Sequence, residues 1–500
     1  MGQSIDKTSF TPVDFERFEE KLHYCLEALD SLLARPGFGQ GSVSIGAELE
    51  LYLVDGRGGP LLRNLEIQAQ SNDPRLTLEL NRYNLEFNLS PVFAAGQPFT
   101  AIEQQMLETL ADLQSLLDEE GGSVIPIGIL PTLGPNHFGE AVMTDTPRYQ
   151  VLAEAIRQSR TDVFGINIDG PDPIHLVHGD VTLEGACTSF QLHYRTDPAR
   201  FGMLWNAIQL VTPLMVGVAA NSPLLLGHRL WHETRVPLFR QSIDDPEVGP
   251  DGWSKPARVS FGHGWLRGNA MELFRETVQL YKPLMPLVSA EDPRAVVAGG
   301  GMPLLDELCL HDGTIWSWNR PIFDPEGDAH VRIEMRSLPA GPTPLDMAAN
   351  AALFIGLAEG LADQLEPLLS ALPFSYAEEN FYRAARDGLQ AQVLWPNARQ
   401  NGLQEQSLVS VLNQLLPTAE RGLASIGVDE KEYRKWLEVI EDRLSTGVNG
   451  ASWQLAQFNQ LMSTGMNRKE VCRQLLAAYQ ARSIANIPVS QWADIEQAEA

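Results

Sequence analysis

Carboxylates, an imidazole and arginines recur at alternate positions in four segments of this sequence. They are Glu48 and Glu50 in 43–54, Glu86 in 76–90, His193 in 188–196, and Glu334 and Arg336 in 329–338. Successive side chains of a β-strand point to opposite faces, so each segment is predicted to be a strand with one polar face.

The opposite face of each predicted strand is apolar. In the first strand this face is continuous, with Val43, Ile45, Ala47, Leu49, Leu51 and Leu53. In the second strand Leu85, Phe87 and Leu89 fill it, and Glu79 precedes Glu86 by seven residues on a strand or turn. The polar groups are therefore expected to stand on strands whose backs are anchored in a core.

These residue types together favour metal-dependent phosphate chemistry. If the four strands share a sheet, their carboxylates repel and raise one another's pKa unless cations neutralise them. Magnesium and manganese take oxygen ligands and tolerate an imidazole, and arginine binds phosphate bidentately. Such a set suits phosphoryl transfer, and the lack of a G-x-x-x-x-G-K-[ST] motif excludes a P-loop enzyme. For any single strand, a sheet face turned to water explains the same alternation.

The elements around these strands predict an α+β body followed by helices. Helices are expected at 13–35, 101–118 and 198–220, with a further strand at 123–129. From about residue 345 the pattern is helical to the end. The expected division is therefore an α+β part over 1–375 and a helical C-terminal region over 376–500.

Charge and cysteine usage limit the possible partners. The formal net charge of −27 is spread along the 500 residues, which disfavours binding to nucleic acid or anionic membranes. The four cysteines lie far apart without a C-x-x-C pair, so reduced thiols of a cytoplasmic protein are expected. The apolar stretch 210–227 contains two prolines and is interpreted as a buried helix and turn rather than a membrane span.

Six motifs in order resemble the glutamate–cysteine ligase family and its carboxylate–amine ligase relatives, within the glutamine synthetase superfamily. They are IGAELELYLVD (45–55), ELNRYNLEFNLSPV (79–92), TPRYQVL (146–152), CTSFQLHYRT (187–196), ANSPLLLG (220–227) and RIEMRSLPAGPT (332–343). The resemblance implies that 1–375 is a glutamine-synthetase-like catalytic domain. It also implies a curved antiparallel sheet with the active site on its concave face.

Roles for individual residues follow from the same resemblance. Glu50, Glu79 and Glu86 would hold one metal ion, Mg²⁺ or Mn²⁺, and Glu48, His193 and Glu334 would hold another. Arg336 would lie against the transferred phosphoryl group, and Arg235 would help to bind phosphate or glutamate. Arg148 and Gln191 would contact substrate or nucleotide.

The implied reaction is ATP-dependent ligation of the γ-carboxylate of glutamate to the amine of cysteine, through an acyl phosphate. One alternative is a carboxylate–amine ligase with another acceptor, such as a polyamine or an amino acid. A second is a non-catalytic nucleotide-binding relative, although every expected ligand position is filled. A glycosidase with two carboxylates would leave the remaining glutamates, His193 and the arginines without a role.

Overall fold

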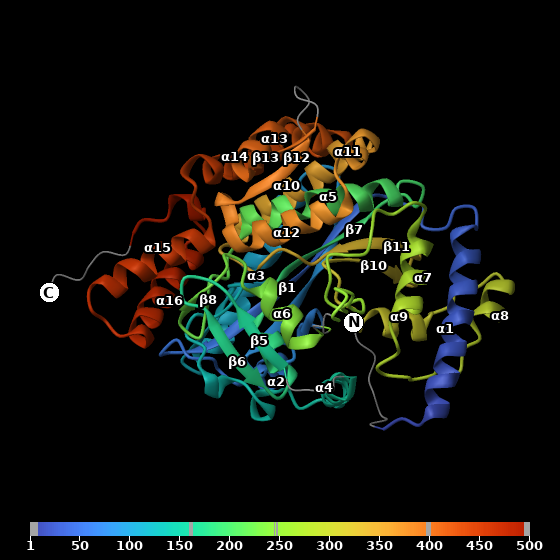
Figure 1. The fold of residues 1–500 in the computed structure, drawn as a ribbon, viewed down its shortest axis with the longest axis horizontal. Helices are drawn as coiled ribbons and strands as arrows, with labels where there is room; N and C mark the ends of the chain where they lie inside the picture. The colour runs from blue at the N-terminus through green and yellow to red at the C-terminus, as the bar shows by residue number, and fades with distance from the viewer. Residues whose placement is uncertain (1–8, 160–163, 245, 247–248, 397–401, 495–500) are drawn as a thin grey trace.

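The centre of the protein is an antiparallel sheet that curls into a half-barrel (Figure 1). The computed structural model describes residues 9–159, 164–244, 246, 249–396 and 402–494. The strand order is β10-β11-β7-β1-β3-β2, and β4 also pairs with β1. The strands are β1 (Ser44–Asp55), β2 (Leu76–Leu78), β3 (Asn84–Phe93), β4 (Gly122–Ile125), β7 (Phe190–Arg195), β10 (Asn319–Asp324) and β11 (His330–Met335).

All four predicted strands with a polar face lie in this one sheet. β1, β7 and β11 follow the expected segments closely, whereas the segment 76–90 is broken by a turn between β2 and β3. The strand expected at 123–129 is confirmed only as far as Ile125. The predicted α+β class with a curved antiparallel sheet is confirmed.

Helices cover the apolar face of the sheet. Ile45, Ala47 and Leu49 on β1 are each at most 2% exposed. α5 (Phe201–Ala219) and α10 (Pro344–Ala362) pack against each other, and α3 (Pro98–Asp118) packs against β3 and α10. α5 and α10 are long and apolar enough to span a membrane, but 89% of each apolar window is buried, so both are core helices.

The remaining helices surround this core. They are α1 (Pro12–Leu33), α2 (Asn64–Ser71), α4 (Pro147–Ser159), α6 (Arg235–Ile243), α7 (Ala270–Leu280), α8 (Pro293–Ala298), α9 (Asp306–Asp312), α11 (Leu365–Ala371), α12 (Phe374–Asp387), α13 (Leu408–Ser425), α14 (Glu430–Thr446), α15 (Gly450–Ser463) and α16 (Arg468–Ile484). α1 packs with α7, α8 and α9 on one side of the molecule, and α15 and α16 lie on the opposite side (Figure 1).

Three two-stranded hairpins stand apart from the main sheet: β5 (Phe164–Ile168) with β6 (Ile174–His178), β8 (Leu224–Leu225) with β9 (His228–Arg229), and β12 (Gln392–Pro396) with β13 (Leu403–Ser407). The β12–β13 hairpin corrects the expectation that the chain is helical throughout from residue 345. Its strands pair Val393 with Gln406 and Trp395 with Gln404, so cross-strand pairing and burial of Val393 override the helical interpretation.

The hydrophobic core is continuous across position 375. Leu49 of β1, Phe381 of α12 and Leu412 of α13 belong to one buried cluster. The helical C-terminal region therefore completes the packing behind the sheet. The division of the chain at 375 stays a prediction.

Candidate active site

Direct cross-strand pairing brings the predicted site residues onto one face. Glu50 of β1 lies opposite Glu86 of β3, and His193 of β7 lies opposite Glu334 of β11. Glu48 is two residues from Glu50 and shares its face. The side chains that the alternation predicted to converge do converge.

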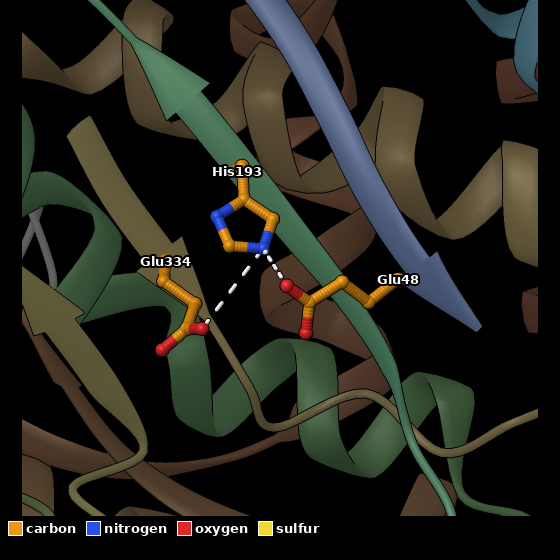
Figure 2. A group of neighbouring side chains, drawn as sticks. All are labelled: Glu48, His193 and Glu334. Carbon is orange, nitrogen blue, oxygen red and sulfur yellow. Dashed lines mark hydrogen bonds and ion pairs between the residues drawn. The ribbon is translucent and has the colours of Figure 1, made fainter. Parts of the chain in front are cut away.

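The first triad consists of Glu48, His193 and Glu334 (Figure 2). Nε2 of His193 lies 2.9 Å from Oε1 of Glu48 and 3.9 Å from Oε1 of Glu334. Glu334 is buried, with a side chain that is 2% exposed. One ligand atom from each residue lies within 4.8 Å of the others, a spacing that suits a shared cation.

Protein cations already compensate the charge of the first triad. Arg320 donates from Nε and Nη2 to the two oxygens of Glu334, at 2.7 and 3.0 Å. Nη1 of Arg336 lies 3.3 Å from the same carboxylate. Burial favours the protonated form, but Arg320, Arg336 and His193 outweigh it and hold the pKa of Glu334 well below its usual range. His193 likewise outweighs burial and lowers the pKa of Glu48.

The second triad consists of Glu50, Glu79 and Glu86, with ligand atoms again within 4.8 Å of one another. Most of the hydrogen bonds to these carboxylates come from neutral donors. Glu50 accepts from the Ser189 backbone N–H at 2.6 Å, and Glu86 accepts from Thr77 and Asn88 at 3.0 and 2.9 Å. Burial and mutual repulsion raise the pKa of Glu50 to about 8, and they raise the pKa of Glu79 and Glu86 as well.

Gln191 and Arg336 lie between the two triads. Gln191 donates from Nε2 to Glu50 at 2.9 Å and accepts at Oε1 from Arg336 at 2.5 Å. The Arg336 guanidinium therefore contacts Glu334 directly and reaches Glu50 through Gln191. Its position is that of a cation shared by both carboxylate groups.

Both triads fit divalent cations by the chemistry of their ligands. The second triad supplies three carboxylates whose pKa values are raised by burial and by mutual repulsion, and Mg²⁺ and Mn²⁺ prefer such oxygen ligands. The first triad adds one imidazole, but Nε of Arg332 donates to Nδ1 of His193 at 3.0 Å. A neutral imidazole that binds a metal through Nε2 carries its proton on Nδ1. Metal binding there therefore requires Arg332 to shift.

Arg235 lies in a buried ion pair rather than toward the triads. It is 2% exposed and donates to Glu233 at 2.8 Å and to the backbone carbonyl of Ser337 at 2.7 Å. Glu233 is itself fully buried. This placement does not support the predicted contact with phosphate or glutamate. Through the hydrogen bond to its carbonyl, Arg235 instead fixes the backbone of Ser337, the residue that follows Arg336.

Arg148 is the second residue of α4 and lies beside the second triad. The hydroxyl of its neighbour Tyr149 donates to the carbonyl of Leu78. Burial raises the pKa of Tyr149 most, and the nearby Glu79 and Glu86 raise it further. Nη1 of Arg148 is buried and has no hydrogen-bond partner among the residues that the structure describes. A guanidinium in this state suits an incoming anion, as predicted for a substrate contact.

Three further charged residues near the triads were not assigned roles from the sequence. Arg320 binds Glu334 from β10, Arg332 contacts His193, and Glu184 lies in a 3₁₀ turn (Val181–Ala186) beside the second triad. Burial raises the pKa of Glu184 to about 7, although Arg336 opposes the shift. Only Arg332 carried a sequence signal, because it alternates with Glu334 and Arg336 in the fourth segment.

Comparison with known proteins adds a family and a fold. The sequence matches the model of "Glutamate-cysteine ligase family 2(GCS2)" over residues 44–475. No curated protein matches it significantly. Among solved structures, a glutamate–cysteine ligase from Francisella tularensis in complex with AMP is 12% identical, with a TM-score of 0.51 and 90% of each chain covered. A bifunctional glutathione synthetase from Pasteurella multocida is also 12% identical, with a TM-score of 0.48, 94% of this chain and 55% of that chain covered.

Proposed function

The chain belongs to glutamate–cysteine ligase family 2. We propose that it joins the γ-carboxylate of glutamate to the amine of cysteine, using ATP. Family membership supports the coarser statement, an ATP-dependent carboxylate–amine ligase. Glutamate and cysteine as the two substrates belong to the proposal.

One observation carries the proposal: two triads of metal-ligand type share one sheet face, with Arg336 and Gln191 between them. A kinase-like step needs positive charge around a triphosphate and little covalent chemistry from the protein. The arrangement supplies ligands for two cations and places arginines at the same site. A non-catalytic relative would have no need to keep both triads complete.

The first step transfers phosphate. An oxygen of the substrate carboxylate attacks the γ-phosphorus of ATP, the bond to the ADP oxygen breaks, and an acyl phosphate forms. Arg336 would neutralise charge on the transferred group, because its guanidinium lies between the triads. Arg148, with a buried nitrogen that lacks a partner in the described structure, would hold an anionic group of the substrate.

The second step forms the amide. The amine nitrogen attacks the acyl carbon, phosphate leaves, and the nitrogen loses a proton. Gln191 and the Ser189 N–H hold Glu50 in place on the sheet, which keeps the second triad aligned during both steps. Mg²⁺ or Mn²⁺, when bound, would supply the charge neutralisation that a polyphosphate reaction needs.

The acceptor amine is tested by a panel of compounds. ADP release is measured with Mg-ATP and glutamate, adding cysteine, other amino acids or polyamines one at a time. The proposal expects cysteine to stimulate turnover most. Stimulation by another amine but not by cysteine would refute the cysteine assignment and leave the ligase class intact.

A control separates ligation from simple ATP hydrolysis. The amide product is quantified by mass spectrometry beside ADP, and the two are expected in equal amounts. ADP without amide in the presence of every amine would count against a ligase. A cytoplasmic location also forms part of this proposal, since all four cysteines are free.

A further inference from the structure

A cavity of about 350 Å³ lies beside β10, outside the candidate active site. Its walls come from α5, α7, the loop between α6 and α7, and the residues that lead into β10. None of the ten predicted site residues lines it. This volume falls in the range of small-molecule sites.

The cavity and the first triad lie on opposite faces of β10. Asn319 and Pro321 line the cavity, whereas Arg320 between them binds Glu334. The cross-strand partners of Asn319 and Pro321 are Met335 and Ile333, which belong to the apolar face of β11. An occupant of the cavity would therefore touch the back of the strand that carries Arg320.

The lining combines aromatic rings with acidic side chains. Trp205 and Tyr281 are 6% and 7% exposed, and Trp265 is partly buried among them. Glu272 is held by Arg267 at 3.0 Å and by the Gly268 N–H at 3.0 Å. The carboxylate of Glu276, one turn along α7, forms no hydrogen bond or ion pair within the described part of the chain.

Two further observations indicate that polar groups of the cavity wall lack some of their hydrogen-bonding or charged partners. Burial and the neighbouring Glu272 raise the pKa of Glu276, and the charge of Arg267 offsets this rise only in part. Asn319 is 2% exposed, and its Nδ2 donates to Gln209 at 2.7 Å, but its Oδ1 has no partner in the described structure. A buried acceptor without a donor costs free energy that a ligand N–H or O–H would recover.

We propose that this cavity binds a small organic cation, with its ammonium group at Glu276 and its hydrocarbon part among Trp205, Trp265 and Tyr281. Aromatic walls and a nearby carboxylate are the two features that recognise such ions, through cation–π attraction and charge pairing. An anionic ligand would meet the carboxylates of Glu272 and Glu276, and Arg267 on the same wall is already paired with Glu272. A neutral ligand would leave Glu276 uncompensated.

The occupant would also be linked to the first triad. Thr277 of the cavity wall donates to Oδ1 of Asp312 at 2.6 Å, and the backbone carbonyl of Asp312 accepts from Nη1 of Arg320 at 3.3 Å. Arg320 in turn holds both oxygens of Glu334. A cation that displaces Thr277 or Asp312 would shift Arg320, and binding at the two places would be coupled reciprocally.

Choline and its neutral isostere 3,3-dimethyl-1-butanol test the proposal on the full-length protein. The quaternary nitrogen of choline cannot be acylated, so turnover does not interfere. Binding is measured by titration calorimetry and by saturation-transfer NMR. We expect choline to bind about tenfold more tightly than the isostere or better. Equal binding, or no binding of choline at millimolar concentrations, would overturn the proposal.

Matched variants locate the binding. Glu276→Gln keeps the shape of the side chain and should lower the affinity for choline about tenfold or more. Glu441→Gln, an exposed change on α14, should leave it unaltered. Unaltered choline affinity in Glu276→Gln would place the binding elsewhere and refute the assignment, whether or not the protein proves to be a ligase.

The linkage is tested by Mn²⁺ binding, followed by electron paramagnetic resonance with and without saturating choline. A shift of the Mn²⁺ dissociation constant of about fivefold is expected, either upward or downward. Asp312→Ala, which removes the acceptor of Thr277 and lies outside the cavity lining, should retain choline binding and abolish the shift. An unshifted Mn²⁺ affinity in the wild-type protein would refute the coupling.

Discussion

The two triads hold similar side chains in different electrostatic states. In the first, Arg320, Arg336 and His193 keep Glu334 ionised despite its burial. In the second, neutral donors surround Glu50 and Glu86, and burial with mutual repulsion raises the pKa values of all three carboxyls. The first triad is therefore compensated by the protein itself, whereas the carboxyls of the second have no ion-pair partner in the described part of the chain, and we expect them to need a cation from outside.

This electrostatic difference predicts that the two triads bind a cation in different ways. Cation binding at the second triad should release protons, because burial and mutual repulsion raise the pKa of Glu50 to about 8 and also raise the pKa values of Glu79 and Glu86. Binding at the first triad should release few, and should instead rearrange the arginines that already occupy the carboxylate lone pairs. The following experiments test the expected assignment of one ion to each triad.

Removal of one ligand from the first triad should have the largest effect. Glu48→Gln and Glu334→Gln should each lower turnover on the order of 10²–10³-fold, since each removes a ligand of the cation that would neutralise the reacting phosphate. ADP release measures the loss, and circular dichroism checks the fold. Near-normal activity in either variant would contradict the site, and Glu441→Gln serves as the exposed control.

Arg336→Lys tests the cation between the triads. Lysine keeps the charge but cannot reach Glu334 and Gln191 with one planar group, so we expect turnover to fall about 10–100-fold. Single-turnover ADP release isolates the chemical step. Arg434→Lys, at an exposed pair with Glu430 on α14, should have no effect. Equal rates for Arg336→Lys and the wild type would show that a point charge suffices.

Arg235→Met contrasts a structural arginine with Arg336. The change leaves Glu233 buried without its partner, which should cost about 3–5 kcal/mol of unfolding free energy. Turnover per folded molecule should change little, because the guanidinium already contacts Glu233 and the Ser337 carbonyl. Urea unfolding and ADP release are compared. A stable variant with a greatly raised KM for glutamate would restore the substrate-binding role.

The pH dependence of stability should differ with and without Mg²⁺. The unfolded carboxyls titrate near a pKa of about 4.3. In the metal-free folded protein the pKa of Glu50 is about 8, and those of Glu79 and Glu86 are also raised. The folded protein thus holds more protons between these values, and its stability should fall as the pH rises through them.

Thermal melts in EDTA and in Mg²⁺ at about pH 6 and about pH 8 measure this fall. We expect Mg²⁺ to raise the Tm by a few degrees more at the higher pH. An equal effect at both values would contradict protonation of the second triad. Glu86→Gln, which removes one of the repelling carboxyls, should reduce the difference.

The sequence predicted those site residues whose positions follow from strand alternation. Glu48, Glu50 and Glu86 share a face because β1 and β3 pair along their length, and His193 and Glu334 join them through β7 and β11. Period-2 patterns carry this information because an apolar face must be buried. The sheet and most of its strands were predictable for the same reason.

Charged residues that are positioned by tertiary contacts show no period-2 pattern in the sequence. Arg320 lies on a six-residue strand beside Pro321, and Glu184 lies in a 3₁₀ turn, so neither falls in a long alternating run. The burial of Arg235 depends on Glu233, two residues away, and on the Ser337 carbonyl, far along the chain. A local pattern cannot show that a charged side chain is already paired.

Mn²⁺ binding counted by electron paramagnetic resonance in the presence of ATP tests the central claim most directly. We expect about two ions per chain in the wild type, and about one in each of the single variants Glu334→Gln and Glu86→Gln. The ion lost in Glu86→Gln should be the one whose binding releases protons. A stoichiometry that stays the same in both variants, or no saturable binding, would contradict the assignment of the two triads.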